Sequence, residues 1–212
     1  MSLRLSGGRR LRSPPGELAR PTASRLRLAV MNLLAAELSG CRWLDLCCGS
    51  GAMACEALQR GAREVVAVDH HRRIAALARA NLEAVAASLP ADVRVHCADV
   101  VRWLGKGTAG PFDLIYVDPP YASGLYAAIG AAVASGAWLR PRGTMVWECA
   151  SDLIPDLPTG WQLRDRRRYG GSTLLLLQEK VPAEAALEPG LSPPGPSRDG
   201  TDSMPPRTDP PG

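Results

Sequence analysis

The chain has 212 residues, of which 46% are hydrophobic and 22% are charged, as in ordinary globular proteins. No apolar run reaches the roughly 20 residues of a membrane-spanning helix, and the N-terminus lacks a secretion signal, so we expect a cytoplasmic protein with no membrane partner. The six cysteines form no CxxC pairs and only three histidines are present, so we expect no metal.

The net charge of +4 is unevenly distributed. Residues 181–212 contain five acidic residues and two arginines and so contribute −3, which leaves +7 for the rest of the +4 total. Almost all of this basicity is arginine, whose planar guanidinium suits phosphates and bases, so the charge favours a nucleic-acid partner.

Three segments are predicted from composition. Residues 1–38 form a basic N-terminal arm, rich in Arg, Gly and Pro, followed by a helix that begins at Thr22 or Ser24. Residues 39–180 form the main domain, and residues 181–212, rich in Pro and Gly, form a disordered tail.

Short apolar runs alternate with helical patterns through the main domain. Strands are expected over 41–46, 64–69, 92–99, 111–118 and 143–150, with helices over 52–62, 72–89, 100–107 and 126–139 between them. Residues 161–178 are expected to form a hairpin that turns at Gly170-Gly171. This order predicts an α/β fold with a mostly parallel sheet and an antiparallel C-terminal edge.

A glycine-rich turn follows the first predicted strand. Asp45 lies near the strand's end, and Gly49 and Gly51 would let the backbone turn tightly and approach a ligand. The third glycine of a dinucleotide-binding loop and the lysine of a phosphate-binding loop are absent. A pyrophosphate ligand is therefore not expected, and a purely structural turn remains an alternative.

Acidic residues end the next two predicted strands. Asp69 could accept hydrogen bonds from the two hydroxyls of a ribose. Asp99 could accept a hydrogen bond from an adenine amino group, or could instead cap the following helix.

The fourth predicted strand ends in Asp118-Pro119-Pro120-Tyr121. Proline fixes its own backbone, so this segment would hold the Asp118 carboxylate and the neighbouring carbonyl rigidly at the ligand end of the sheet. A rigid turn without chemistry is the alternative.

Together these features resemble the class I S-adenosylmethionine-dependent methyltransferases. The Asp-Pro-Pro-Tyr run resembles the motif of enzymes that methylate nitrogens of nucleobases. The N-terminal segment is similar to that of the bacterial RsmD family, in its Gly7-Gly8, Arg9-Arg10, Arg20-Pro21-Thr22 and the helix with Arg25, Arg27 and Asn32.

The resemblance implies a Rossmann-like fold with a seven-stranded sheet and methylation of a guanine N2 in 16S ribosomal RNA. It implies S-adenosylmethionine as cofactor, 16S rRNA or a small-subunit assembly particle as partner, and a monomer. The implied site comprises catalytic Asp118, Pro119, Pro120 and Tyr121; cofactor-binding Asp45, Cys47, Gly49, Gly51, Asp69 and Asp99; and RNA-binding Arg9, Arg10, Arg12, Arg20, Thr22 and Arg25.

Two other functions remain as alternatives. DNA adenine-N6 methyltransferases carry the same four-residue motif, but they usually add a target-recognition domain, for which this chain leaves no room. A non-catalytic RNA-binding module on a decayed methyltransferase fold is the second, and the intact Asp45, Gly49, Gly51 and Asp118 argue against it.

Overall fold

A computed structural model describes residues 3–13, 21–107, 109–120 and 124–180. The helices are α1 (Pro21–Leu33), α2 (Ala35–Leu38), α3 (Ala52–Gln59), α4 (Arg72–Ala86), α5 (Val100–Leu104) and α6 (Leu125–Ser135). The strands are β1 (Arg42–Leu46), β2 (Glu64–Asp69), β3 (Asp92–Cys97), β4 (Phe112–Val117), β5 (Leu139–Ala150), β6 (Trp161–Tyr169) and β7 (Ser172–Glu179).

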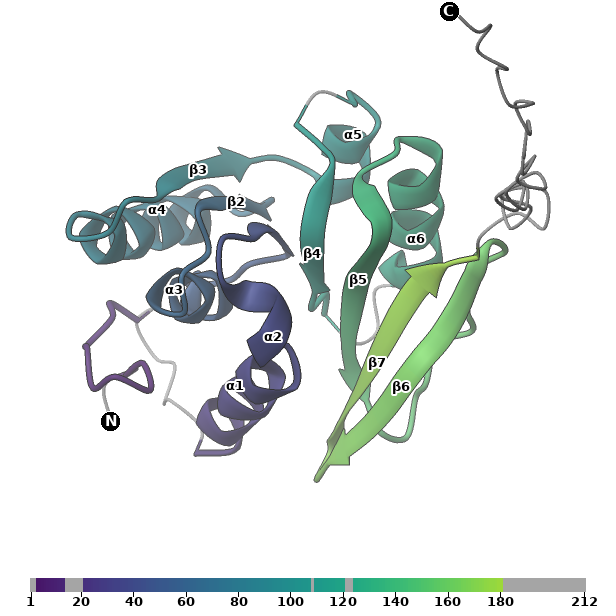
Figure 1. The fold of residues 1–212 in the computed structure, drawn as a ribbon, viewed down its shortest axis with the longest axis horizontal. Coiled ribbons are helices and arrows are strands. Elements are labelled where there is room, and N and C mark those ends of the chain that lie inside the picture. The colour runs from purple at the N-terminus through teal and green to yellow at the C-terminus, as the bar shows by residue number, and fades with distance from the viewer. Residues whose placement is uncertain (1–2, 14–20, 108, 121–123, 181–212) are drawn as a thin grey trace, which may run out of the picture. The chain divides into compact units, whose positions relative to one another are not determined.

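The strands form one seven-stranded sheet in the order β3-β2-β1-β4-β5-β7-β6. The first five strands of this order are parallel, and β7 and β6 add antiparallel pairs at one edge, as the sequence predicted. The strand order reverses between β1 and β4 (Figure 1), which is where open α/β sheets bind ligands.

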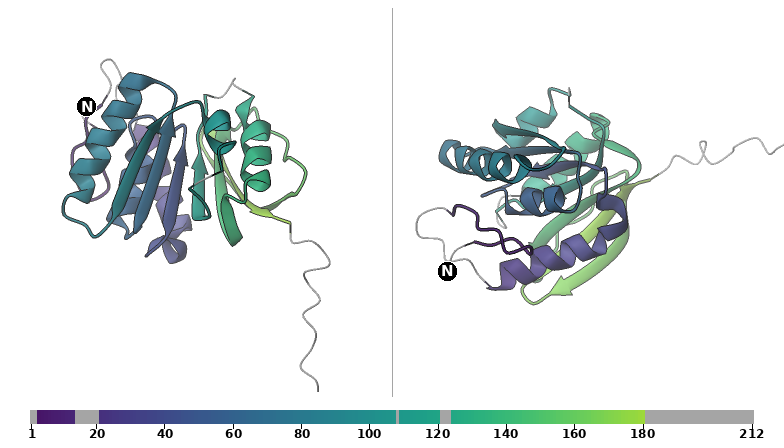
Figure 2. Two further views of the ribbon diagram at one scale, coloured as in Figure 1. Left: turned by 90° about the horizontal axis from the view of Figure 1, so that it is seen from above. Right: turned by 60° about the vertical axis from the view of Figure 1, so that its left-hand side comes forward.

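Helices cover both faces of the sheet and bury two separate cores (Figures 1 and 2). One core joins α1, α3 and α4 to the sheet, and the other joins α5 and α6 to its opposite face. The central strands are buried on both faces, which explains their nearly continuous apolar sequences.

The arm is part of the first core. Leu5 and Leu11 of the arm are buried with Leu26 and Val30 of α1 among the side chains of α3 and α4. The described residues belong to one compact unit that ends at Lys180. Packing therefore holds the arm on the main domain instead of leaving it as a separate basic extension.

Several elements differ from the sequence-based expectation, and the helices predicted over 72–89, 100–107 and 126–139 end earlier, at Ala86, Leu104 and Ser135. The helix predicted to reach Leu38 divides into α1 and the short α2, and it begins at Pro21, a residue well suited to a first helical turn. Glu37 of α2 accepts hydrogen bonds from Thr144 of β5 at 3.0 Å and from Arg164 of β6 at 2.8 Å. These contacts tie α2 to the sheet, and α1 lies beside the hairpin of β6 and β7 (Figures 1 and 2).

The strand predicted over 143–150 begins earlier, at Leu139, because a register shift between Phe112 and Leu114 of β4 accommodates the extra residues. Within the described part of the chain, no helix combines the length and apolar character that crossing a membrane requires.

Candidate active site

The loop after β1 contains three residues with positive φ. The φ angles are 62° at Cys47, 53° at Gly49 and 75° at Gly51. Glycine adopts such angles readily, whereas a residue with a Cβ is strained by about 1–3 kcal/mol. At Gly51 a Cβ would also lie 3.3 Å from the Cβ of Ala78 in α4. The glycines therefore permit the tight turn, and its surroundings hold Cys47 in a strained conformation typical of functional loops.

Asp45 lies beneath this loop. The residue is 1% exposed, and its Oδ2 accepts a hydrogen bond from the Ala54 backbone N–H of α3 at 3.1 Å. Burial, together with the nearby charge of Asp69, raises the pKa of Asp45 to about 8. Its hydrogen bond fixes the start of α3, directly after the loop. The predicted contact of Asp45 with a cofactor stays a prediction.

Asp69, at the end of β2, holds the same loop from the side. Its Oδ2 accepts a hydrogen bond from the Gly49 N–H at 3.0 Å, and its Oδ1 accepts one from the His71 N–H at 2.9 Å. A carboxylate oxygen can accept more than one hydrogen bond, so both oxygens keep capacity for ligand hydroxyls. Asp69 thus positions the loop and also faces the crevice beside it.

A cavity of about 500 Å³ opens beside the loop at the carboxyl ends of the central strands. Its lining includes Gly49, Asp69, Asp118, Pro119 and Pro120, which come from three different loops. The fold therefore brings the glycine-rich turn and the Asp-Pro-Pro segment together around one space, although some 70 residues separate them along the chain.

A second cavity of about 260 Å³ adjoins the first and shares Cys47, Asp69 and Pro120 with it. The apolar side chains of Val68, Val100 and Leu125 contribute to its lining, together with Asp99. Asp99 also caps α5, because its Oδ1 accepts the Arg102 backbone N–H at 2.9 Å. The structure confirms Asp99 as the helix cap and places it in the lining of the crevice, whereas its contact with an adenine amino group stays a prediction.

The lining of the two cavities indicates the kind of ligand they suit. Asp69, Asp99 and Asp118 contribute carboxylates, whereas the described lining residues include no arginine or lysine. Such a surface suits hydroxyl groups, amino groups and positive charge, and it is unsuited to a pyrophosphate.

Asp118 follows β4 directly at the point where the strand order reverses. Its backbone N–H donates to the Leu46 carbonyl at 3.3 Å, which holds the residue beside the end of β1. Burial raises its pKa well above the ordinary value, and the charges of Glu148 and Asp45 raise it further. Pro119 is buried and Pro120 is exposed, and both line the cavity. The rigid segment is therefore packed against the protein at Pro119 and accessible to a ligand at Pro120.

Glu148 of β5 is a charged residue at this site that sequence patterns did not single out. Its Oε2 accepts a hydrogen bond from the Tyr116 hydroxyl of β4, and Tyr126 donates to its backbone carbonyl. An isolated acid within the apolar run of residues 145–149 was the available signal, since charged residues are seldom buried without a purpose.

Asn81 of α4 is a second residue that the patterns did not indicate. It is buried, its Oδ1 accepts the Arg12 N–H at 2.9 Å, and its Nδ2 donates to the Arg12 carbonyl at 3.0 Å. The same Nδ2 donates to the carbonyl of Ser50 in the glycine-rich loop at 2.9 Å. One side chain therefore connects the N-terminal arm with the loop beside the cavity.

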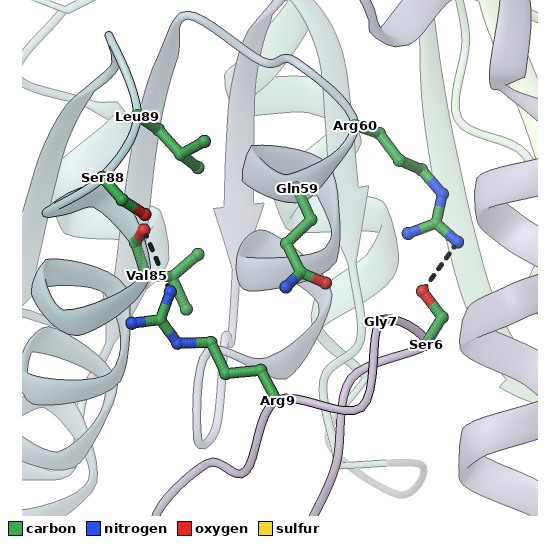
Figure 3. Close-up of a pocket in the computed structure, with 8 residues that line it drawn as sticks. All are labelled: Ser6, Gly7, Arg9, Gln59, Arg60, Val85, Ser88 and Leu89. Atoms are coloured by element: carbon green, nitrogen blue, oxygen red, sulfur yellow. Dashed lines mark hydrogen bonds between the residues drawn. The ribbon is translucent and has the colours of Figure 1, made fainter.

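A separate cavity of about 410 Å³ lies where the arm meets α3 and α4 (Figure 3). Arg9 reaches across it to the Ala84 and Val85 carbonyls at the end of α4, at 2.5 and 3.4 Å. On the other side Arg60 contacts the Ser6 hydroxyl at 3.1 Å (Figure 3). Arg9, predicted to bind RNA, therefore caps a helix C-terminus in this structure.

The other predicted RNA-binding residues fall into two groups. Arg10, Arg12 and Arg25 are exposed and belong to the arm and α1. Arg20 and the side chain of Thr22 lie outside the described residues, as does Tyr121 of the predicted catalytic segment.

Comparison with known families and sequences shows which family this chain belongs to. The family model described as "Conserved hypothetical protein 95" matches residues 5–178. Ribosomal RNA small subunit methyltransferase D of Escherichia coli is 28% identical over 180 residues, which cover 84% of this chain and 88% of that protein. The protein of the same name from Haemophilus influenzae is 26% identical over 164 residues, covering 77% of this chain and 84% of that protein.

Solved structures confirm the predicted fold class. Escherichia coli yhhF superposes with a TM-score of 0.72 at 28% identity, covering 85% of this chain and 99% of that one. The rRNA methyltransferase aviRa of Streptomyces viridochromogenes shares the fold alone, with a TM-score of 0.60 at 22% identity over 78% of this chain and 88% of that one. Because the family model spans residues 5–178, the chain belongs to the family that it describes, the RsmD family, as its arm and loop motifs predicted.

Proposed function

We propose that this chain transfers a methyl group from S-adenosylmethionine to the exocyclic N2 of a guanine in small-subunit ribosomal RNA. The observation that carries this proposal is that Gly49, Asp69 and Asp118-Pro119-Pro120 line one and the same cavity. The methyltransferase relatives support S-adenosylmethionine as the cofactor, and the name of the Escherichia coli relative supports ribosomal RNA as the substrate.

The residues of the two cavities fit the parts of that cofactor. Asp69 would accept the hydrogen bonds of the ribose hydroxyls. Val68, Val100 and Leu125 would contact the adenine ring, with Asp99 as acceptor for its amino group. The turn at Gly49 leaves room for close approach of the amino-acid portion, since a Cβ there would meet open space.

The cofactor supplies an electrophilic methyl carbon on a sulfonium, so the protein's task is to prepare the acceptor nitrogen. The lone pair of an exocyclic amino group is conjugated with the base. Asp118 would accept one N–H of this group and the Pro119 carbonyl the other, which favours a pyramidal nitrogen with an available lone pair. Fixing that geometry can lower the barrier by several kcal/mol.

The rigid segment would also present the base. Pro120 limits movement of the two acceptors because its φ is fixed by the ring. Tyr121, as the family resemblance implies, would stack on a base that has left its helix. The exposed Arg10, Arg12 and Arg25 would contact RNA phosphates from the arm and α1.

The test is methylation of ribosomal RNA from a strain that lacks the gene, with the product mapped to a single nucleotide. A methyl group on one guanine N2 supports the proposal. A product on adenine N6 of DNA, or no methyl transfer despite cofactor binding, would contradict it.

A further inference from the structure

Asp118, directly after β4, and Glu148 of the neighbouring β5 carry carboxylates on the same face of the sheet. Val117 of β4 pairs in parallel with Trp147 of β5, and the residue that follows each of them is an acid. The side chains of Tyr116 and Val146 face the core beneath α1, whereas Val117 and Trp147 face the opposite core. Alternation places Asp118 and Glu148 on the α1 side, next to each other.

The hydrogen bonds around Glu148 confirm this placement. The Tyr116 hydroxyl, two residues before Asp118 on the same face, donates to Glu148 Oε2. A further hydrogen bond joins the Glu148 side chain to Ser172 of β7. The carboxylate is therefore held in place beside Asp118, and it lies at the ligand end of the sheet.

The charges that face this pair compensate it only in part. The titratable groups that face the pair are the neutral thiol of Cys47, the neutral phenol of Tyr116, the acid Asp45 of β1 and, facing Glu148, Arg27 of α1. Arg27 is the basic member, and it also lies 3.9 Å from Glu56 and donates to the Arg4 carbonyl at 2.8 Å. Burial raises the pKa of both Asp118 and Glu148, and mutual repulsion raises that of Asp118 further.

Two neighbouring half-buried carboxylates that repel each other, with Arg27 acting on Glu148, favour a state that holds a proton between them. We propose that Glu148 is a positioning residue whose carboxylate shares a proton with Asp118, so that the charge of the pair follows the charge of the bound cofactor. This inference rests on the proposed methyltransferase function.

The reaction then balances within the site. Binding of a cation stabilises the ionised pair, which releases its proton to solvent. Methyl transfer forms the N–C bond and breaks the C–S bond, and the sulfur keeps the electron pair and becomes neutral. The acceptor nitrogen loses a proton. The carboxylate pair takes up this proton, because the neighbouring sulfur no longer carries a positive charge. Neither the free protein nor the product complex then carries an uncompensated pair of carboxylates.

Calorimetry in two buffers with different ionisation enthalpies measures the protons released on ligand binding. The full chain would be titrated with S-adenosylmethionine and with S-adenosylhomocysteine, which differ in the sulfonium charge and the transferable methyl group. We expect proton release on binding of S-adenosylmethionine but not of S-adenosylhomocysteine. The affinity for S-adenosylmethionine relative to S-adenosylhomocysteine should then rise with pH, by up to about tenfold per pH unit for one linked proton. Equal proton release for both ligands would overturn the inference. This measurement uses the wild-type protein and requires no variant.

Glu148→Gln then assigns the effect. It keeps a similar shape while removing one charge, so proton release should fall by about half or more. The matched control is Glu179→Gln, at the far end of β7, where burial also raises the pKa of a half-buried glutamate. Unchanged release in a folded Glu148→Gln protein would leave Glu148 with a purely structural role. Failure of both ligands to bind would instead contradict the proposed function.

Discussion

Asn81 donates a hydrogen bond to the Ser50 carbonyl at 2.9 Å while its amide also pairs with the Arg12 backbone. The N-terminal arm and the loop beside the cavity are therefore joined through one buried side chain. In this RsmD family member, the hydrogen bonds of Asn81 therefore hold both the segment proposed to contact RNA and the segment proposed to contact the cofactor.

Replacing Asn81 with alanine should affect both segments. The Arg12 N–H and the Arg12 and Ser50 carbonyls would lose their partner, which should lower the free energy of unfolding by about 3 kcal/mol. S-adenosylmethionine should bind several-fold more weakly because the loop loses an anchor. Denaturant unfolding and calorimetry measure the two effects. The control is Asn32→Ala, an exposed asparagine on α1, and equal behaviour of the two variants would show that the Asn81 connection has no effect.

Asp118→Asn should separate chemistry from cofactor binding. It removes the carboxylate that we propose accepts an N–H of the base, so turnover should fall by about two orders of magnitude or more. The cofactor dissociation constant should change by less than about tenfold, because Asp69 and the loop remain. Single-turnover methylation and calorimetry test this pair of outcomes. Wild-type turnover in the variant would exclude the proposed role.

Asp69→Ala should show the reverse pattern. The variant loses the proposed acceptor for the ribose and the hydrogen bonds to the Gly49 and His71 N–H groups. The cofactor dissociation constant should rise by about 100-fold, corresponding to about 3 kcal/mol. Asp92→Ala, an exposed acid that begins β3, is the control. Calorimetry that finds the same affinity for both variants would remove Asp69 from the site.

Arg12 and Arg25 should contribute to RNA binding through phosphates. Replacing both with alanine should weaken binding and reduce the slope of log affinity against log salt by about 0.7 for each phosphate of single-stranded RNA that the variant no longer neutralises. Arg63→Ala tests the removal of a single charge elsewhere, for comparison with each single variant, since this exposed arginine precedes β2 at the opposite end of the sheet. An unchanged slope in the double variant would indicate that the arm is only a solvated basic surface.

Asp45 should make the protein less stable as the pH rises. Its folded pKa of about 8 lies above the ordinary value near 4 of an unfolded chain, so its stabilising contribution is present at low pH and is lost as the pH approaches 8. Asp45→Asn keeps an acceptor for the Ala54 N–H without the titration. We therefore expect the wild type to lose stability relative to this variant between pH 5 and pH 8 in denaturant unfolding. A constant difference across that range would mean that Asp45 does not titrate there.

The elements of the fold were predictable because their signals are local. Short apolar runs between helical patterns indicated the strands, and strands in parallel order bring their carboxyl ends to one edge. Asp69 and Asp118 could thus be assigned to a common crevice from their positions at strand ends. The division at Leu34 was not predictable, since the contacts of Glu37 in α2 come from strands more than 100 residues later.

The sequence by itself determined the alternating α/β order, the turn at Gly49 and Gly51, and the acids at the strand ends, because each depends on residues near one another in the chain. Only the tertiary structure decided which polar groups meet. Glu148 lies beside Asp118 because β5 pairs with β4, Asn81 joins the arm to the loop because α4 packs against both, and Arg9 caps a helix 75 residues away. Such pairings follow from strand register and helix packing, which local patterns do not specify.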